Sequence, residues 1–478
     1  MASMAMRRLL LLFSVGASGL VLALALARPA RGAGPEAESP VAAAYVREAL
    51  ARNLGLQARA LNLEQAQSRL AEARSAYLPR LDLVARYSVA DGGRTIDFPA
   101  GDLLNGVYRT LNELLVSQGR PTAFPQIENQ SIALLRDREQ ETKLRLTQPL
   151  YRPEIARGVH ASRSAAASQA SQLDAYKREL RYTVLMAYHH YVQAVLAERI
   201  LASAAELTTE ALRVNRVLAE ADKVTPDRVL RAEADDLAVA QARAEAQRDR
   251  RTAQAYFNTL LDRPLDAAIL EEAAERLAAG AEWLASDRVA LPDSPARREE
   301  LRALEQAVAA AEAAESAVRA RLLPKLGLAV EGGIQGTSYR RGEGSDFVQG
   351  SVVGEINLWD GHERRSQLAQ ARIERRRVEL QLASARQQLA LEVQAAGDTF
   401  RAAQAGYRAA QRRSEAAREA FALVEARERE GLASQLTFLD ARNELTRAEL
   451  NAAITRQQLF VAAAALDRAA AESPLPEL

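Results

Sequence analysis

The sequence of 478 residues contains no cysteine and only 5% aromatic residues. Without cysteine the chain has no disulfide framework, no thiolate metal site and no residue that could carry a lipoprotein anchor. Lys and Arg number 63 against 62 Asp and Glu, with both signs interspersed, so no surface for nucleic acid is indicated. Ala, Leu, Glu, Arg and Gln dominate instead, which is typical of long helices and coiled coils.

Long apolar runs are also missing, with one exception at the start of the chain. Arg7 and Arg8 precede an apolar run at residues 9–26, and small residues follow up to Ala33. This order predicts a secretory signal peptide at residues 1–33. The alternative is an uncleaved membrane anchor, because a run of roughly 18 residues can just span a bilayer. We expect export with cleavage and no later transmembrane helix.

The rest of the chain carries an internal duplication. A Leu-Pro turn ends an Ala-rich helical stretch both at residues 76–81 and at 321–326. Two further motifs recur with nearly equal offsets, 208 residues (358 − 150) and 209 residues (439 − 230). Matched offsets of this kind predict a tandem repeat. Each repeat is expected to contain a helix, two strands, a very long helix and a final helix.

These expectations divide the chain into a signal peptide, a first repeat, an intervening segment, a second repeat and a tail. In that order the predicted ranges are 1–33, 34–266, 263–296, 297–470 and 471–478. After an initial helix, the first repeat is predicted to have strands at about 80–90 and 141–151 and helices at about 153–220 and 226–262. The second is predicted to have strands at about 325–335 and 347–358 and helices at about 361–430 and 434–470.

The strands are predicted from proline and from alternation. Pro79 and Pro324 lack the N–H that a helix interior needs, so the helices before them stop. Apolar and charged residues alternate in all four predicted strands, which have about ten residues each, as in transmembrane β-strands. A half-buried sheet against a helical layer is the alternative. Because a membrane barrel needs about eight strands, four predict a barrel shared by two, three or four copies.

The two strand-to-strand connections differ in length. The first, residues 91–140, is long, and the amphipathic stretch from Leu103 to Leu115 is a candidate helix within it. The second, at about 336–346, is expected to be a loop rich in Gly and charge.

The long helices are predicted from a heptad pattern and the absence of proline between residues 361 and 430. Apolar residues recur there at spacings of three, four and seven, which indicates a packing seam: Leu382, Leu389, Val393, Ala396, Phe400, Ala403 and Tyr407. A helix of this length measures about 100 Å, too long for a compact domain. The pattern fits a hollow helical cylinder or an antiparallel coiled coil without a channel.

The predicted hairpin tips carry capping residues. Thr225 is a candidate N-cap with Pro226 at the first helical position. At the second tip, Gly431 fits a helix C-cap and Ser434 the following N-cap.

Residues with catalytic or metal-binding chemistry do not form a recognisable motif. The four histidines are scattered and are expected at helix surfaces or interfaces: His160, His189, His190 and His362. No nucleophile elbow or phosphate-binding loop occurs, and the many carboxylates fit solvated helix faces. We therefore expect neither an enzyme nor a bound cofactor or metal.

Over roughly residues 41–470 the chain resembles the TolC family of outer-membrane efflux proteins. The resemblance rests on the two Leu-Pro turns, on motifs before each long helix, and on the stretch after the last long helix. These motifs are Gln148-Pro149-Leu150-Tyr151, Leu358-Trp359-Asp360-Gly361, and Gly431-Leu432-Ala433-Ser434 leading to Leu439-Asp440-Ala441.

The resemblance implies a mainly α fold with a membrane β part. In this family three chains form a twelve-stranded outer-membrane barrel that continues into a twelve-helix periplasmic tunnel. The implied partners are two further copies, a periplasmic adaptor, an inner-membrane transporter and outer-membrane lipid. The implied function is passive export of small molecules or proteins through the outer membrane. Residues 263–296 and the ends of the mature chain are expected to form a belt around the middle of the tunnel.

The resemblance also implies functional positions near the hairpin tips. Asp440 matches an aspartate of the ring that narrows the tunnel entrance, whereas Thr437 departs from the family pattern one turn earlier and Arg228 takes the corresponding place in the first repeat. The alternative for Asp440 is a solvated carboxylate near a helix N-terminus. The tip residues expected to dock the adaptor are Thr225, Pro226, Gly431, Leu432 and Ser434.

A second class of function stays open from the sequence. A periplasmic coiled-coil adaptor or scaffold without a pore would also have long antiparallel helices. Adaptors usually carry a compact β-domain between helical arms, whereas this chain has two separated strand pairs.

Overall fold

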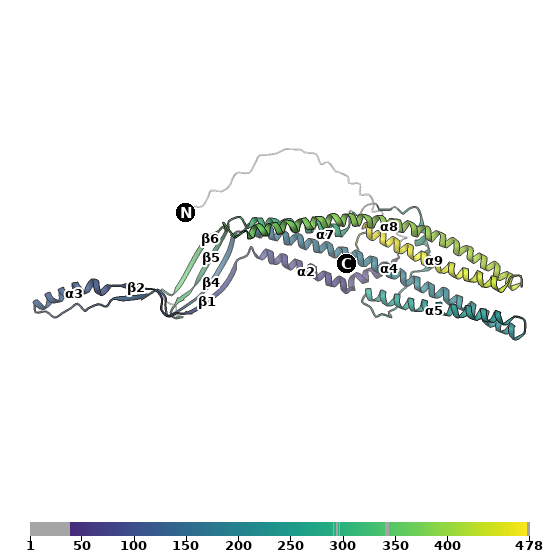
Figure 1. Cartoon of the computed structure of the whole chain (residues 1–478), viewed down its shortest axis with the longest axis horizontal. Helices are drawn as coiled ribbons and strands as arrows, with labels where there is room; N and C mark the ends of the chain where they lie inside the picture. Colours follow the sequence, from purple (N-terminus) through teal and green to yellow (C-terminus); the bar gives the residue numbers. More distant parts are fainter. Residues whose placement is uncertain (1–38, 290, 293–294, 296, 340–343, 476–478) are drawn as a thin grey trace, which may run out of the picture.

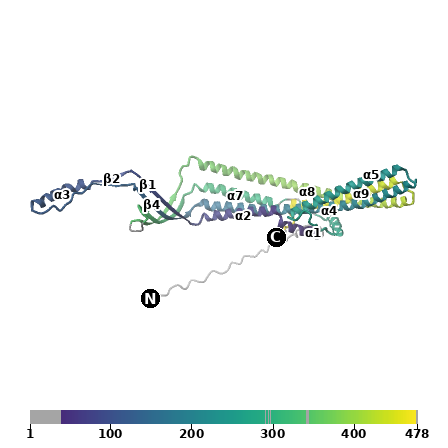
Figure 2. The same ribbon diagram turned by 90° about the horizontal axis from the view of Figure 1, so that it is seen from below.

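The computed structural model describes residues 39–289, 291–292, 295, 297–339 and 344–475. The predicted signal peptide, residues 1–33, lies outside the described residues. The molecule is elongated: long helices form one end, a β-sheet follows, and a thin arm projects beyond the sheet (Figure 1). Figure 2, turned by 90°, shows the same order along the long axis.

Helices make up most of the described chain. They are α1 (Pro40–Arg52), α2 (Leu54–Ser75), α3 (Ala100–Ser117), α4 (Pro153–Glu220), α5 (Pro226–Leu260), α6 (Ala274–Ala285), α7 (Glu299–Ala320), α8 (Glu363–Arg429) and α9 (Gln435–Ala470). The two longest have 68 residues in α4 and 67 in α8. The tertiary contacts of α4 and α5, and of α8 and α9, pair these helices into two hairpins (Figure 1). Among the residues that the structure describes, no helix combines the length and apolarity needed to cross a bilayer.

The first helical stretch is divided at Asn53. The Asn53 side chain accepts a hydrogen bond from the Leu56 N–H at 3.0 Å and so caps the start of α2. Its amide group donates to the Leu260 carbonyl at 2.9 Å, near the end of α5. Asn53 therefore ends α1 through its backbone, and its side chain begins α2 and attaches this junction to a distant helix.

The main sheet has four antiparallel strands in the order β1-β4-β5-β6. Their bounds are β1 (Arg80–Val89), β4 (Arg138–Tyr151), β5 (Lys325–Gly336) and β6 (Asp346–Glu355). β1 and β5 begin directly after Pro79 and Pro324. The strands of the two halves of the chain thus join into one sheet through the β4–β5 pair.

Where β6 ends and α8 begins, the bounds differ from the sequence expectation for local backbone reasons. β6 ends at Glu355 rather than about 358, because its partner β5 begins at Lys325, which pairs with Glu355. α8 begins at Glu363 rather than 361, because Gly361 and His362 have φ of 63° and 74°, outside the helical region.

The connection at 91–140 has more structure than the candidate helix predicted within it. It contains α3, which is longer than Leu103 to Leu115, and a two-stranded antiparallel sheet of β2 (Thr95–Phe98) and β3 (Gln130–Ala133). β4 already begins at Arg138, before the predicted 141. These elements form the arm that projects beyond the main sheet (Figure 1).

The main hydrophobic core lies midway along the helices, and we call it the equatorial core. It joins residues of α1, α4, α6, α8 and α9 with residues at the end of α5. Its members include Tyr45, Tyr188, Phe257, Phe400 and Leu459. A smaller cluster packs Leu382 and Leu389 of α8 against Leu301 of α7. All seven residues of the predicted seam of α8 are buried or pack against these two clusters.

Candidate functional site

One face of the main sheet is apolar and exposed. Leu81 pairs with Leu146, and Leu83 with Leu144, so leucines of β1 and β4 lie side by side. Leu83 is 70% exposed and Val352 of β6 is also 70% exposed. Apolar side chains on a protein surface mark contact with a lipid or protein partner when they are contiguous.

The other face of the sheet carries a row of ion pairs. Arg86 of β1 lies 3.3 Å from Glu141 of β4, and Glu141 lies 2.7 Å from Lys143. Lys143 in turn lies 2.8 Å from Glu331 of β5, which also pairs with Arg145. The row crosses three strands and gives the sheet a hydrophilic wall opposite its apolar face.

The two outer strands of this sheet have a partner on one side only among the described residues. β1 pairs with β4, and β6 pairs with β5. In a membrane each unpaired backbone group would cost several kcal/mol. If the apolar face contacts lipid, β1 and β6 therefore need strands from other copies of the chain.

The second hairpin tip is closed by glycine and serine. Gly431 has φ of 73°, and the Leu432 N–H donates to the Arg427 carbonyl at 2.8 Å, which closes the end of α8. The Ser434 hydroxyl accepts from the Thr437 N–H at 3.2 Å and begins α9. Leu432 is 74% exposed at the apex of this turn.

The first hairpin tip also has a residue with positive φ after its long helix, but this residue is not glycine. Asp222 has φ of 55°, and the Lys223 N–H donates to the Leu218 carbonyl at 2.8 Å. Thr225 is the N-cap of α5, with Pro226 in the first turn. A hydrogen bond from Thr225 lowers the pKa of the Asp227 carboxyl. Sequence reasoning missed Asp222, because aspartate is less specific for this conformation than glycine.

The three residues predicted for the constriction lie in different surroundings. Asp440 and Thr437 are exposed on α9. The Thr437 hydroxyl lies 2.9 Å from the Ser434 hydroxyl, within the cap of its own helix. Arg228 is half-buried and donates from Nε to the Gln435 side chain of the other hairpin. Only Asp440 is therefore placed as an exposed charge without a described side-chain partner.

A second contact between the hairpins lies two turns further from the tip. Arg442 of α9 donates to the Asp235 carboxylate of α5. Both contacts join residues 207 positions apart in the sequence, so α5 and α9 face each other with the same offset at these two positions near the tips. Arg442 is only 2% exposed, and its Nε and Nη1 atoms have no hydrogen-bond partner among the described residues.

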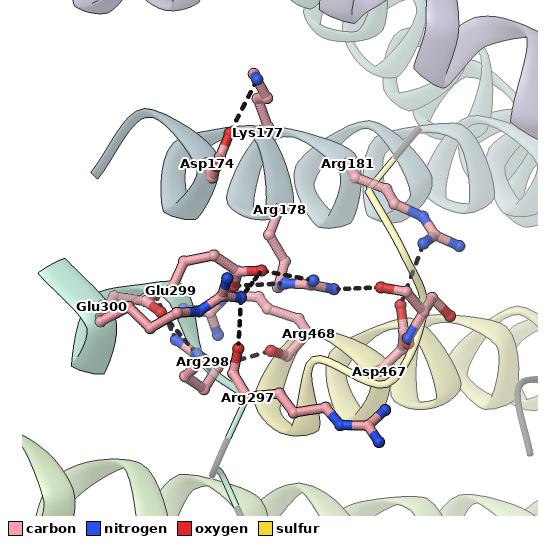
Figure 3. Close-up of polar contacts among 12 residues, drawn as sticks. Asp174, Lys177, Arg178, Arg181, Arg297, Arg298, Glu299, Glu300, Asp467 and Arg468 are labelled. Atoms are coloured by element: carbon pink, nitrogen blue, oxygen red, sulfur yellow. Dashed lines mark hydrogen bonds and ion pairs between the residues drawn. The ribbon is translucent and has the colours of Figure 1, made fainter. Parts of the chain in front are cut away.

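An ion-pair network borders the equatorial core, and Figure 3 shows its centre. Arg178 of α4 donates to both carboxylate oxygens of Glu299 at 2.9 and 2.8 Å, and both side chains are nearly fully buried. Arg298 pairs in the same way with Glu300 at 2.9 and 2.7 Å. Arg468 of α9 bridges Glu179 and Glu392, and Arg181 lies 3.4 Å from Asp467. We call these nine residues the equatorial network.

The network also binds backbone carbonyls in the last turn of α9 and just after it. Arg298 donates to the Arg468 carbonyl at 2.9 Å, and Arg178 donates to the Ser473 carbonyl at 3.0 Å. Burial of Glu300 opposes its charged form, but the hydrogen bond and charge of Arg298 outweigh it and lower the pKa of the carboxyl. Sequence reasoning treated these charges as solvated helix faces and missed the network.

His189 packs inside the helical region and has a structural role there. His189 is buried between α4 and α9, its Nδ1 lies 2.8 Å from the Gln457 side-chain oxygen, and its ring stacks on Phe460. Burial lowers the pKa of His189 to about 4, so it is neutral near pH 7. Among the described residues no group of three or more His, Asp or Glu side chains could hold a metal ion.

Known proteins of similar sequence or fold share this architecture. Residues 290–472 match the family described as Outer membrane efflux protein. No curated protein sequence matches the chain. The outer-membrane channel OprN is similar in structure, with 19% identity, a TM-score of 0.70 and 92% of each chain covered.

Two further channels have the same fold. The CmeC outer membrane channel of Campylobacter jejuni has 15% identity and a TM-score of 0.72, over 91% of this chain and 86% of that one. The open state of the MtrE outer membrane channel of Neisseria gonorrhoeae has 20% identity and a TM-score of 0.70, over 90% and 89%.

Proposed function

We propose that this chain, whose residues 290–472 match the outer membrane efflux protein family, is an outer-membrane channel-tunnel that passively exports small molecules or proteins. Its fold over more than nine tenths of the chain is that of an outer-membrane channel. The observation that carries the proposal is a four-stranded sheet with one exposed apolar face, in which β4 and β6 lead through short connections into α4 and α8, helices about 100 Å long.

Three copies complete the pore in this proposal. Four strands from each copy give a twelve-stranded barrel, in which β1 of one copy pairs with β6 of the next. The apolar face then contacts lipid, and the row from Arg86 to Glu331 faces the lumen. The hairpins α4–α5 and α8–α9 of the three copies form a twelve-helix periplasmic tunnel. In this proposal the tandem repeat explains why each copy supplies two strand pairs and two helix hairpins.

The regions of the tunnel have separate roles. Residues 263–296 and the ends of the mature chain form an equatorial belt, which the buried side chains of α1, α6 and the end of α9 support. The hairpin tips dock a periplasmic adaptor and, through it, an inner-membrane transporter that supplies the energy. Exposure of Leu432 and of the Thr225–Pro226 turn suits such docking.

Asp440 supplies the narrowing at the tunnel entrance. Three exposed copies around an axis would favour cations. Asp440→Asn should lower the cation-to-anion permeability ratio roughly twofold, as a shift of the reversal potential under a salt gradient. Glu430→Gln is the matched control, because it removes the same charge from the other side of the same tip. An Asp440→Asn channel with the selectivity of the control would remove Asp440 from the constriction.

The test of the function itself is extraction and conductance. The protein should be recovered from purified outer membranes as a detergent-soluble trimer and should give stepwise conductance in planar bilayers. A periplasmic adaptor or scaffold without a pore is the competing function, and it predicts a water-soluble protein without conductance. Recovery of a soluble monomer would refute the channel.

A further inference from the structure

The arm beyond the main sheet is an ordered structure that the channel function leaves unused. It runs from β1 through β2, α3 and β3 to β4, and it points away from the long helices (Figures 1 and 2). In the proposed orientation it stands at the extracellular mouth of the barrel.

Two asparagines bind the returning segment of the arm along one side of α3. The Asn105 side chain donates to the Ile127 carbonyl and accepts from its N–H, both at 2.8 Å. Asn112 makes the same pair of bonds with Phe124, at 2.6 and 3.1 Å. A Cβ on Gly101 would lie 2.4 Å from the Ile127 carbonyl oxygen, so the close approach requires glycine. These contacts fix α3 in one orientation on its own return segment.

An apolar stripe lies on a different side of α3 and is exposed. Leu104, Val107, Leu111 and Leu114 follow one another at spacings of three, four and three. Leu103 flanks them and is 64% exposed, while Val107 is 55% exposed. This heptad spacing is that of a seam between packed helices. We call these five residues the arm stripe.

We infer that the arm stripe packs against the arm stripes of two other copies, so that three α3 helices form a cap over the outer mouth of the pore. The inference rests on the proposed function, which supplies the threefold arrangement. Its geometric basis is that the arm is continuous with β1, the edge strand through which neighbouring copies would pair. Each arm therefore starts beside a boundary between copies.

The charges of α3 favour another helix over a membrane surface as the occupant. Helices that bind anionic membranes in the surface plane have Lys and Arg on the polar face. α3 carries Asp102, Arg109 and Glu113, a net charge of −1, and no lysine. The helical period places these three residues opposite the arm stripe, so they would face water in a three-helix cap.

Cysteine cross-linking tests the cap, and the absence of native cysteine makes every introduced thiol unique. Leu111→Cys places a thiol in the arm stripe, and Arg109→Cys is the control on the opposite side of the same exposed helix. After oxidation in outer membranes, Leu111→Cys should give linked dimers at least about fivefold more than the control, because a disulfide needs Cα atoms within about 7 Å. Each trimer can form one such bond.

Trimer formation, measured on the same samples in detergent, separates the two proposals. A trimer in which Leu111→Cys links no more than Arg109→Cys would overturn the cap and leave the channel intact. Quenching of a fluorophore on Cys-substituted position 111 by brominated lipid would also overturn the cap and would identify lipid as the occupant. Absence of any trimer would refute the proposed channel, and the cap with it.

Conductance gives an independent readout of the cap. Leu111→Asp should increase the conductance or open probability of the trimeric channel, because three buried carboxylates would separate the helices. Arg109→Asp should leave both close to those of the unmodified channel. Equal conductance in Leu111→Asp and the unmodified channel would contradict closure by α3.

Discussion

The equatorial core and the main sheet differ in where their apolar side chains lie. Tyr188 and Phe257 in the equatorial core are fully buried by helices of the same chain. Leu83 and Val352 in the sheet are 70% exposed, and the outer strands β1 and β6 are paired on one side only among the described residues. The equator is therefore completed by one chain, whereas the sheet requires surroundings that one chain does not provide.

Charges follow the same division. In the equatorial network, Arg178 and Glu299 are about as buried as the apolar core residues beside them. In the sheet, ion pairs such as that of Arg86 with Glu141 stay partly accessible on one face. Removal of one buried partner leaves an uncompensated charge, so substitutions should be far more costly at the equator.

The largest effect should come from breaking the buried pair of the network. Arg178→Ala should lower the free energy of unfolding by about 3–5 kcal/mol, because it removes the bidentate partner of buried Glu299 and leaves only the contact with Arg302 at 3.4 Å. Arg213→Ala is the control, since its pair with Glu210 on α4 is exposed and should be worth less than about 1 kcal/mol. Denaturant unfolding followed by helical circular dichroism measures both. Similar midpoints for the two variants would show that the network is not stabilising.

A smaller effect should appear when a charge is placed on the apolar face of the sheet. Leu83→Lys should destabilise the assembled barrel by about 2–4 kcal/mol if that face contacts lipid. Gln349→Lys is the control, because it lies at a similar level on the polar face, opposite Glu331. The fraction of trimer resistant to heating in detergent is the readout. If the control loses as much trimer as Leu83→Lys, the two faces have been assigned wrongly.

Acid should lower the stability of the equatorial region more than that of the sheet, because His189 lies in the equatorial region. Its pKa is about 4 in the folded chain, against about 6.5 in an unfolded chain, so the unfolded state binds more protons between these values. Stability should therefore fall as the pH decreases, by about 2 kcal/mol between pH 7 and pH 5. His189→Gln should reduce this slope, whereas His190→Gln, at the exposed neighbour, should not. Unfolding midpoints at both pH values are the measurement. If His189→Gln loses as much stability between pH 7 and pH 5 as the unmodified protein, His189 is not the cause of the loss.

The smallest effect is expected at the first hairpin tip, far from both regions. Asp222→Gly should raise stability by up to about 1 kcal/mol, because glycine adopts a φ of 55° without steric cost. Asp222→Ala should lower it, since alanine gains no local hydrogen bond in this conformation. Thermal unfolding of the two variants gives the comparison. A gain with Asp222→Ala equal to that with Asp222→Gly would indicate that the backbone conformation is not the cause.

The sequence contains clear signals for features that depend on neighbouring residues. Proline at 79 and 324 fixes where strands begin, and Gly431 with Ser434 fixes the second tip. The heptad pattern identifies the buried side of α8, because burial repeats with the helical period.

Features that join distant residues were not predictable in the same way. The pairs Arg442–Asp235 and Arg178–Glu299 join helices that lie far apart in the sequence, and each charged residue has many possible partners on helix faces. The helix of the arm was predicted, but the packing of the returning segment on it was missed, because Asn105 and Asn112 resemble ordinary polar residues until that segment is placed beside them. The predicted roles of Asp440 and the tips stay predictions.

Cross-linking of the sheet edges between copies tests most directly that one chain supplies only part of a barrel. In the cysteine-free chain, cysteines introduced pairwise along β1 and β6 should form β1-to-β6 disulfides between copies, in one antiparallel register, and should yield covalent trimers in outer membranes. Exclusive β1-to-β6 disulfides within single chains, or an absence of linkage in any register, would contradict a shared barrel.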